Sequence, residues 1–219
     1  MAAVLVVALI TAWVAGSAVG PGSGGVPGST DATRLGPAAG EDVASYLERA
    51  RAVPPGPSGP RLALVTFAAG QDVAGAAAAV DGTTAREAVF RVPLPRVQTA
   101  LRRVPLDVTG AVAPAEALRL AEAQAANRAG EQARTSSGRP ATVAATESAR
   151  LSAGCPCVLA AVVETDPALV PALAARAGVR AVEVAPAGAR PGALAVSPLL
   201  PEQTATVGPV PDDGPVPPP

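Results

Sequence analysis

Histidine and lysine are both missing from the 219 residues, and all 17 basic residues are arginine. Without histidine there is no Ser-His-Asp or Cys-His nucleophile, no imidazole general base and no imidazole metal ligand. Without lysine there is no phosphate-binding loop ending in Gly-Lys and no Schiff-base residue. The carboxylates are scattered and form no recognisable acid/base pair. We therefore predict that the protein is not an enzyme and that it binds no cofactor or metal.

Aromatic side chains and net charge are also scarce. Aromatics make up 2% of the chain, so valine, leucine and alanine have to fill the interior. Each of these contributes less by burial than phenylalanine or tryptophan would. The net charge is −1, which leaves no basic surface for a nucleic acid, and we predict no nucleic-acid partner.

The first apolar segment, residues 2–20, carries no charge over 19 positions. At ~1.5 Å per residue, a helix of this length just crosses a hydrocarbon core of ~30 Å. Gly16, Ser17 and Ala18 are small residues that suit a cleavage site, so a cleaved signal peptide is the alternative. We expect a retained single-pass anchor in the cell membrane with the rest of the chain outside the cytoplasm. Secretion after cleavage is the other possibility.

Composition divides the remaining chain into three parts. Residues 21–60 form a neck rich in glycine and proline, in which 41–53 has the spacing of a short amphipathic helix. Residues 61–197 are expected to form one domain. Residues 198–219 are rich in proline and are expected to be a disordered tail.

The domain contains one pattern twice, a strand, a helix and a second strand. The first copy predicts a strand at 62–67, a helix at about 71–80 and a strand at 87–92. The second predicts a strand at 158–163, a helix at about 167–177 and a strand at 180–184. Asp166-Pro167 suits the start of a helix, and Gly178 suits its end. Two such units predict an α+β fold, a ferredoxin-like two-layer sandwich with helices on one face of an antiparallel sheet.

The residues between the two copies are harder to interpret. Residues 97–106 are expected to extend the sheet as a further strand at an edge. Residues 114–134 begin with proline and are rich in alanine, which predicts a helical insertion. Residues 135–153 have few large apolar side chains, and we expect a mobile connection there.

Cys155-Pro156-Cys157 is the motif with the most chemical content. Two cysteines are too few for a zinc site, although a thiolate pair can bind Cu(I). In an extended chain their Cα atoms would lie ~6.7 Å apart, at the limit of disulfide geometry, so a bond between them requires a local turn. We rank a local disulfide or structural pair first, an intermolecular disulfide second, and redox or metal chemistry third.

Arg96, Arg102 and Arg103 form a small basic cluster. Such a cluster is usually a solvated edge of a sheet. The alternative is contact with an anionic surface such as lipid or a cell-wall polymer.

Three functional hypotheses remain. The first is a membrane-tethered, extracytoplasmic binding or structural module without catalysis, whose partner is an unidentified protein or component of the cell envelope. The second is a secreted thiol redox or Cu(I)-handling protein acting through Cys155 and Cys157. The third comes from residues 181–185, which follow Ala-Arg-Ala-Gly-Val and resemble the closing strand of ferredoxin-like protease prodomains. That resemblance implies an inhibitor-like or prodomain-like module.

Overall fold

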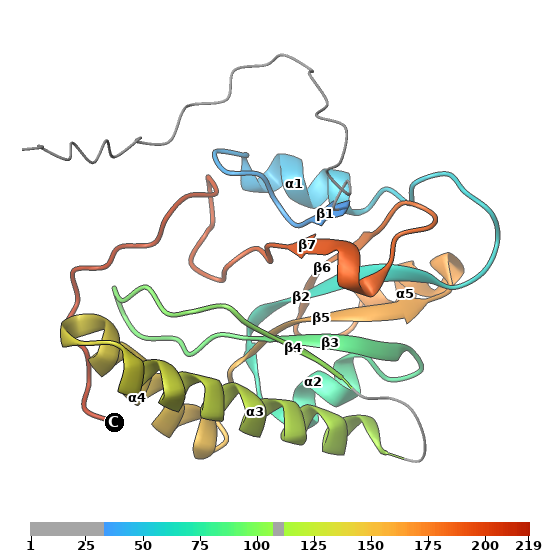
Figure 1. The fold of residues 1–219 in the computed structure, drawn as a ribbon. Coiled ribbons are helices and arrows are strands. Elements are labelled where there is room, and N and C mark those ends of the chain that lie inside the picture. The colour runs from blue at the N-terminus through green and yellow to red at the C-terminus, as the bar shows by residue number, and fades with distance from the viewer. Residues whose placement is uncertain (1–32, 107–111) are drawn as a thin grey trace, which may run out of the picture. The chain divides into compact units, whose positions relative to one another are not determined.

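The computed structural model describes residues 33–106 and 112–219, and at its centre lies a five-stranded antiparallel sheet (Figure 1). The strands lie in the order β4-β3-β5-β2-β6. They are β2 (Arg61–Gln71), β3 (Thr84–Phe90), β4 (Arg102–Pro105), β5 (Val158–Thr165) and β6 (Val179–Val184). The four strands predicted from the repeated pattern all lie in this sheet, which confirms an α+β fold.

The two repeated units interleave within the sheet. Both β2 and β3 run antiparallel to β5, which lies between them, so β2 and β3 are parallel to each other. In the same way β5 and β6 lie on either side of β2. Of the strand predicted at 97–106, only β4 forms; residues 97–101 follow a turn at Arg96, whose φ is 55°, and lie outside any strand.

Helices cover one face of the sheet. They are α2 (Val73–Ala79), α3 (Pro114–Thr135), α4 (Gly138–Ser152) and α5 (Val170–Ala174), the last preceded by the 3-10 turn η1 (Pro167–Leu169). Alternate residues of β2, namely Ala63, Val65 and Phe67, are fully buried beneath them. Pro171 lies in the first turn of α5, where the missing N–H costs no hydrogen bond. The α-helix therefore starts later than the predicted position 167.

The opposite face of the sheet is also covered, so the two-layer arrangement expected from the sequence is incomplete. Its cover consists of α1 (Val43–Ala50) and a parallel pair of short strands, β1 (Thr33–Leu35) and β7 (Leu194–Val196), with the 3-10 turn η2 (Pro191–Ala193) before β7. Leu62 and Leu64 of β2 pack here against Leu35 and Leu194. Burial on both faces explains why residues 62–65 of β2 and 158–163 of β5 are apolar at every position rather than at alternate ones.

Glu183 of β6 accepts the hydrogen bonds that hold residues 36–49 of the neck against this face. One carboxylate oxygen accepts hydrogen bonds from Gly36 N at 2.6 Å and from the Tyr46 hydroxyl at 3.3 Å, and the other accepts from Arg49 Nη1 at 2.8 Å. Burial and the negative charge of Glu183 raise the pKa of Tyr46, which keeps it a hydrogen-bond donor. The predicted helix at 41–53 forms as α1, capped by Asp42.

The expectation of a mobile connection at 135–153 is wrong, because residues 138–152 form α4. Its side chains are small, and this allows α4 to approach α3 closely. Ser148 Oγ donates to the Ala126 carbonyl at 3.0 Å, and a Cβ on Gly130 would come within 3.1 Å of that same Oγ. Close contact between helices replaces the large apolar side chains that the segment lacks.

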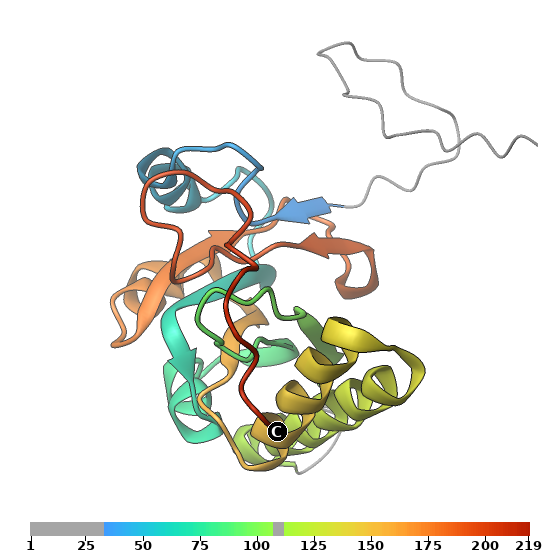
Figure 2. The ribbon, with the colours of Figure 1, turned by 90° about the vertical axis from the view of Figure 1, so that its left-hand side faces the viewer.

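The expectation of a disordered tail is also wrong for residues 198–219, which cross the molecule and end beside α4 (Figure 2). Leu199 is fully buried, and Arg180 donates to the carbonyls of Leu200 and Gln203. Farther along, Gly214 N donates to the Arg96 carbonyl at 2.8 Å. The tail is held by backbone and side-chain hydrogen bonds to distant segments, and its composition alone gave no sign of them.

The predicted anchor or signal segment, residues 2–20, lies outside the described residues. Within residues 33–106 and 112–219, no helix is both long and apolar enough to cross a membrane.

Candidate functional site

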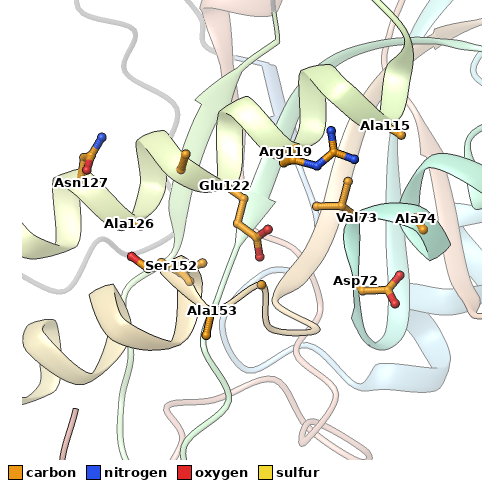
Figure 3. Close-up of a pocket in the computed structure, with 13 residues that line it drawn as sticks. Asp72, Val73, Ala74, Ala115, Arg119, Glu122, Ala126, Asn127, Ser152 and Ala153 are labelled. Atoms are coloured by element: carbon orange, nitrogen blue, oxygen red, sulfur yellow. The ribbon is translucent and has the colours of Figure 1, made fainter.

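A groove of about 600 Å³ lies between the start of α2, one side of α3 and the end of α4 (Figure 3). The start of α2 is set by Asp72, whose Oδ1 accepts a hydrogen bond from Gly75 N at 2.7 Å. The end of α4 is followed by Gly154, whose φ of 75° favours glycine. The groove therefore joins segments that are far apart in the sequence.

Glu122 is the buried acid of this groove. It is only 6% exposed, and Figure 3 shows its carboxylate extending from α3 into the space between Asp72 and Ala153. Its Oε1 has no hydrogen-bond partner within the described part of the chain. Burial raises the pKa of Glu122, and the negative charge of Asp72 raises it further. A buried acceptor left without a donor costs about 1–3 kcal/mol.

The charges around the groove favour a positive occupant. Asp72 and Glu122 both line it, and the only basic residue among its lining residues, Arg119, forms an ion pair with Glu116 one turn away. The carboxyl end of α4 borders the groove, and a helix carries roughly half a negative charge at that end.

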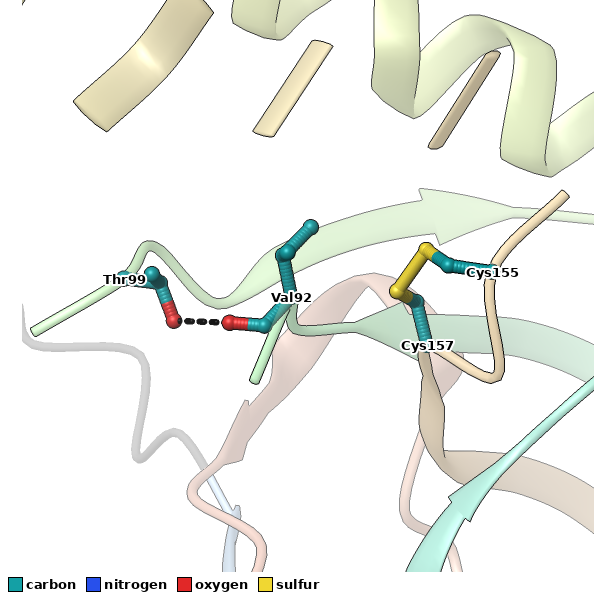
Figure 4. Close-up of a disulfide and its surroundings, with 4 residues drawn as sticks. All are labelled: Val92, Thr99, Cys155 and Cys157. Atoms are coloured by element: carbon teal, nitrogen blue, oxygen red, sulfur yellow. Dashed lines mark hydrogen bonds between the residues drawn. A yellow bond between two sulfur atoms is a disulfide. The ribbon is translucent and has the colours of Figure 1, made fainter. Parts of the chain in front are cut away.

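The second candidate, the Cys155-Pro156-Cys157 motif, forms a disulfide-closed turn (Figure 4). The two Cα atoms are 5.2 Å apart, closer than in an extended chain, because the Cys157 N–H donates to the Cys155 carbonyl at 2.7 Å. This is the local turn that the bond requires. Figure 4 shows it near the segment after β3, where Thr99 Oγ1 donates to the Val92 carbonyl at 2.7 Å.

The disulfide turn lies against the sheet and directly follows Gly154, which lines the groove. Cys157 is fully buried in the main core, and Cys155 is partly buried against it. A Cβ on Gly70 would overlap the Pro156 carbonyl oxygen, so the end of β2 passes directly against the turn. The turn thus packs the chain that follows α4 against the end of β2, which leads directly to Asp72 in the groove. A sulfur in a disulfide is not a thiolate and so is not available as a metal ligand.

The three arginines predicted to contact an anionic surface are engaged within the fold. Their carboxylate partners are Asp213 for Arg96, Glu147 for Arg102 and Glu87 for Arg103. The Arg102 side chain is only 10% exposed. These arginines therefore do not form a free basic cluster, and their positions do not support the expected contact with lipid or a wall polymer.

In the sequence, Glu122 is one of many scattered carboxylates. A signal was present in its spacing, because Glu122 follows Leu118 by four positions and precedes Ala125 and Ala129 by three and seven. These positions lie on one face of a helix, and all four residues are buried. A single acid inside an apolar stripe is the feature that could have found the site.

Comparisons with known proteins add no relative. A scan against models of protein families, a search of curated proteins and a search of solved structures each found no match to this chain. In the described residues, no group of three or more His, Cys, Asp or Glu side chains is placed to hold a metal ion.

Proposed function

We propose that the protein is a non-catalytic binding module, tethered to the cell membrane outside the cytoplasm, and that its ligand occupies the groove between α2, α3 and α4. One observation carries the binding proposal: Glu122 lies in the groove, almost completely buried, with an oxygen that lacks a donor. Buried polar groups without partners are uncommon in folded proteins, and a bound ligand is one way to satisfy them.

The disulfide supports a location outside the cytoplasm, because such bonds persist mainly in oxidising compartments. The tether is the uncharged segment 2–20, with signal cleavage and secretion as the alternative. Protease added to intact spheroplasts should digest the domain, and the amino-terminal fragment should stay with the membranes. Full protection of the domain would overturn this location, and a soluble mature chain would indicate cleavage.

The fold proposal is that the sheet elaborates a ferredoxin-like core. In support, each of the two strand–helix–strand units encloses one strand of the other, as in a split βαβ pair. β4 then extends the sheet beside β3, and α3 and α4 are inserted between the units. This topology is also the support for a prodomain-like role, and nothing else in the described residues favours that role.

The thiol redox alternative has weaker support. Opening the disulfide by attack on Cys155, the more accessible sulfur, would release Cys157 as a thiolate inside the apolar core. An apolar environment raises the pKa of a thiol and makes it a poor leaving group. The pair is therefore better suited to holding the turn than to exchange.

The binding proposal is tested with a fluorinated fragment mixture that contains neutral, anionic and cationic compounds. Ala123 lines the groove and is exposed, so Ala123→Trp fills the groove without entering the core. The neighbouring Gln124 is exposed and does not line the groove, which makes Gln124→Trp a matched control.

We expect fragments whose 19F signals broaden with the full-length protein and with Gln124→Trp, but not with Ala123→Trp. If no fragment bound the unmodified protein, or if Ala123→Trp bound all of them unchanged, the groove would not be the binding site.

A further inference from the structure

We propose that the groove takes a primary ammonium or guanidinium group at the end of a short aliphatic chain, with Glu122 as its principal acceptor. This proposal rests on the groove being the binding site, and it specifies the chemical class of the ligand. Three features of the lining support this ligand: its unpaired acceptor, its charge and its lack of aromatic rings.

The unpaired acceptor requires a ligand that donates hydrogen bonds. Glu122 Oε1 is buried and has no donor among the described residues. A carboxylate offers only acceptors, and its strongest partners are the N–H groups of ammonium and guanidinium ions. An anion would meet repulsion at this position, and a hydrocarbon would leave the acceptor unsatisfied.

The charge of the lining selects a cation over a neutral donor. Asp72 lines the groove at the start of α2, where its Oδ1 accepts from Gly75 N. Arg119, the basic residue of the lining, is paired with Glu116. The end of α4 contributes the negative end of its helix dipole. Glu122 and Asp72 outnumber Arg119 in the lining, so a positive group would meet a net negative charge there.

The apolar part of the lining is made of small side chains such as Ala115 and Ala126, with Val73 and Leu151 among the larger ones. These surfaces suit the methylene groups of a short chain. No aromatic ring lines the groove, so it lacks the cage of rings that holds quaternary ammonium ions. A quaternary ammonium also has no N–H to donate, and we expect it to bind poorly.

Binding should be coupled to proton release. Burial and Asp72 both raise the pKa of Glu122, so its carboxyl keeps a proton to higher pH than an exposed glutamate does. A cation beside the carboxylate lowers its pKa again, and the proton leaves as the ligand binds. Asp72 and Arg119 are the other charged groups of the lining, and each can be substituted to measure its share.

The experiment is isothermal titration of the full-length protein with n-butylammonium and n-butylguanidinium, compared with tetramethylammonium and butan-1-ol. Glu122→Gln removes the charge and keeps the side-chain volume. Glu131→Gln removes an exposed charge from the same helix and is the control. Titrations in phosphate and in Tris, whose ionisation enthalpies differ, count the protons released, and a thermal melt checks that each variant is folded.

We expect the two hydrogen-bonding cations to bind, with affinity reduced roughly tenfold or more in Glu122→Gln and unchanged in Glu131→Gln. In titrations repeated as pH is lowered towards the ordinary glutamate range, proton release should accompany binding and disappear in Glu122→Gln. Equal binding of butan-1-ol and n-butylammonium, or unchanged affinity in Glu122→Gln, would overturn the cation proposal while leaving the groove as a binding site. Failure of every probe and every fragment would overturn both proposals.

Discussion

The α3–α4 pair has two regions that treat a buried glutamate in opposite ways. In the second half of α4, Glu147 is 1% exposed, accepts a hydrogen bond from Ala100 N at 2.6 Å and forms an ion pair with Arg102. On α3, beside the end of α4, Glu122 is 6% exposed and has an oxygen without a donor. We call these regions the satisfied end and the open end after the glutamate oxygens alone, because Arg102 Nε at the first of them is itself buried without a hydrogen-bond partner.

The difference in hydrogen-bond partners indicates that Glu147, rather than Glu122, stabilises the fold. At the satisfied end, β4, residues 97–100 and the tail converge on α4, and each supplies a hydrogen-bond partner to the others. At the open end, the start of α2 and the end of α4 leave a groove. Burial is similar at the two ends, so the number of partners, rather than burial, distinguishes Glu147 from Glu122, the acid that we propose binds a ligand.

The largest effect should follow from Glu147→Ala at the satisfied end. The substitution leaves Arg102 buried without its carboxylate, and we expect a loss of about 3–5 kcal/mol in the free energy of unfolding, measured with urea. The double variant Arg102→Met with Glu147→Leu should lose much less, because it leaves no unpaired charge. A loss below about 1 kcal/mol for Glu147→Ala would remove the contrast between the two ends.

Glu122→Leu at the open end should stabilise the protein, in contrast to Glu147→Ala. Removing an acceptor without a donor should raise the free energy of unfolding by about 1 kcal/mol or more at pH 7. The pKa of Glu122 is raised in the folded state, so its contribution to stability is present below the unfolded pKa of about 4.3 and is lost as pH rises through the folded pKa.

The pH dependence of stability separates the effect of the Glu122 charge from other effects of the substitution. The stability advantage of Glu122→Gln over the unmodified protein should grow as pH rises above the ordinary glutamate range and then level off. Exposed Glu131→Gln should show no such growth. Destabilisation by Glu122→Leu at pH 7 would mean that the carboxylate already has a partner in solution.

Replacing Cys155 and Cys157 together with serine should have a smaller effect. The disulfide closes a loop of only three residues, for which loop-closure entropy gives about 1.5 kcal/mol. Urea unfolding of the double variant should agree with that of the reduced unmodified protein. A loss of about 4 kcal/mol would show that the bond holds far more than its own turn.

The smallest effect should come from Asp213→Asn in the tail. The Arg96–Asp213 pair is exposed on both sides, with 61% and 64% of the side chains accessible, so global stability should change by no more than the scatter of the measurement. Local opening is the sharper readout, measured as hydrogen exchange at the Gly214 amide, which donates to the Arg96 carbonyl.

The Arg96–Asp213 pair also determines how the stability of the tail should change with pH. The Arg96 guanidinium lowers the pKa of Asp213, so the contribution of the pair is present above the ordinary aspartate range and is lost as pH falls through the lowered pKa. The difference in Gly214 exchange between Asp213→Asn and the unmodified protein should therefore vanish in acid. An equal difference at all pH values would mean that the charge of Asp213 does not hold the tail.

The elements predicted well are those whose signal is local. The apolar runs that became β2, β3, β5 and β6, the helix of residues 114–135 and the cap at Asp166 follow from periodicity and side-chain chemistry within a few residues. Helix α4 and the tail were missed because their stabilising partners lie elsewhere. Ser148 depends on the Ala126 carbonyl, and Thr146 Oγ1 reaches the Pro217 carbonyl at 2.7 Å.

By itself, the sequence determined an α+β fold with four apolar strands, the residue types available for chemistry, and the need for a turn before Cys155 and Cys157 can pair. Only the tertiary structure decided which glutamate has partners and which lines a groove. The reason is that hydrogen-bond satisfaction and desolvation depend on which distant segments meet around a side chain. Glu122 and Glu147 look alike in the sequence, and the packing of α2, β4 and the tail around α3 and α4 makes them different.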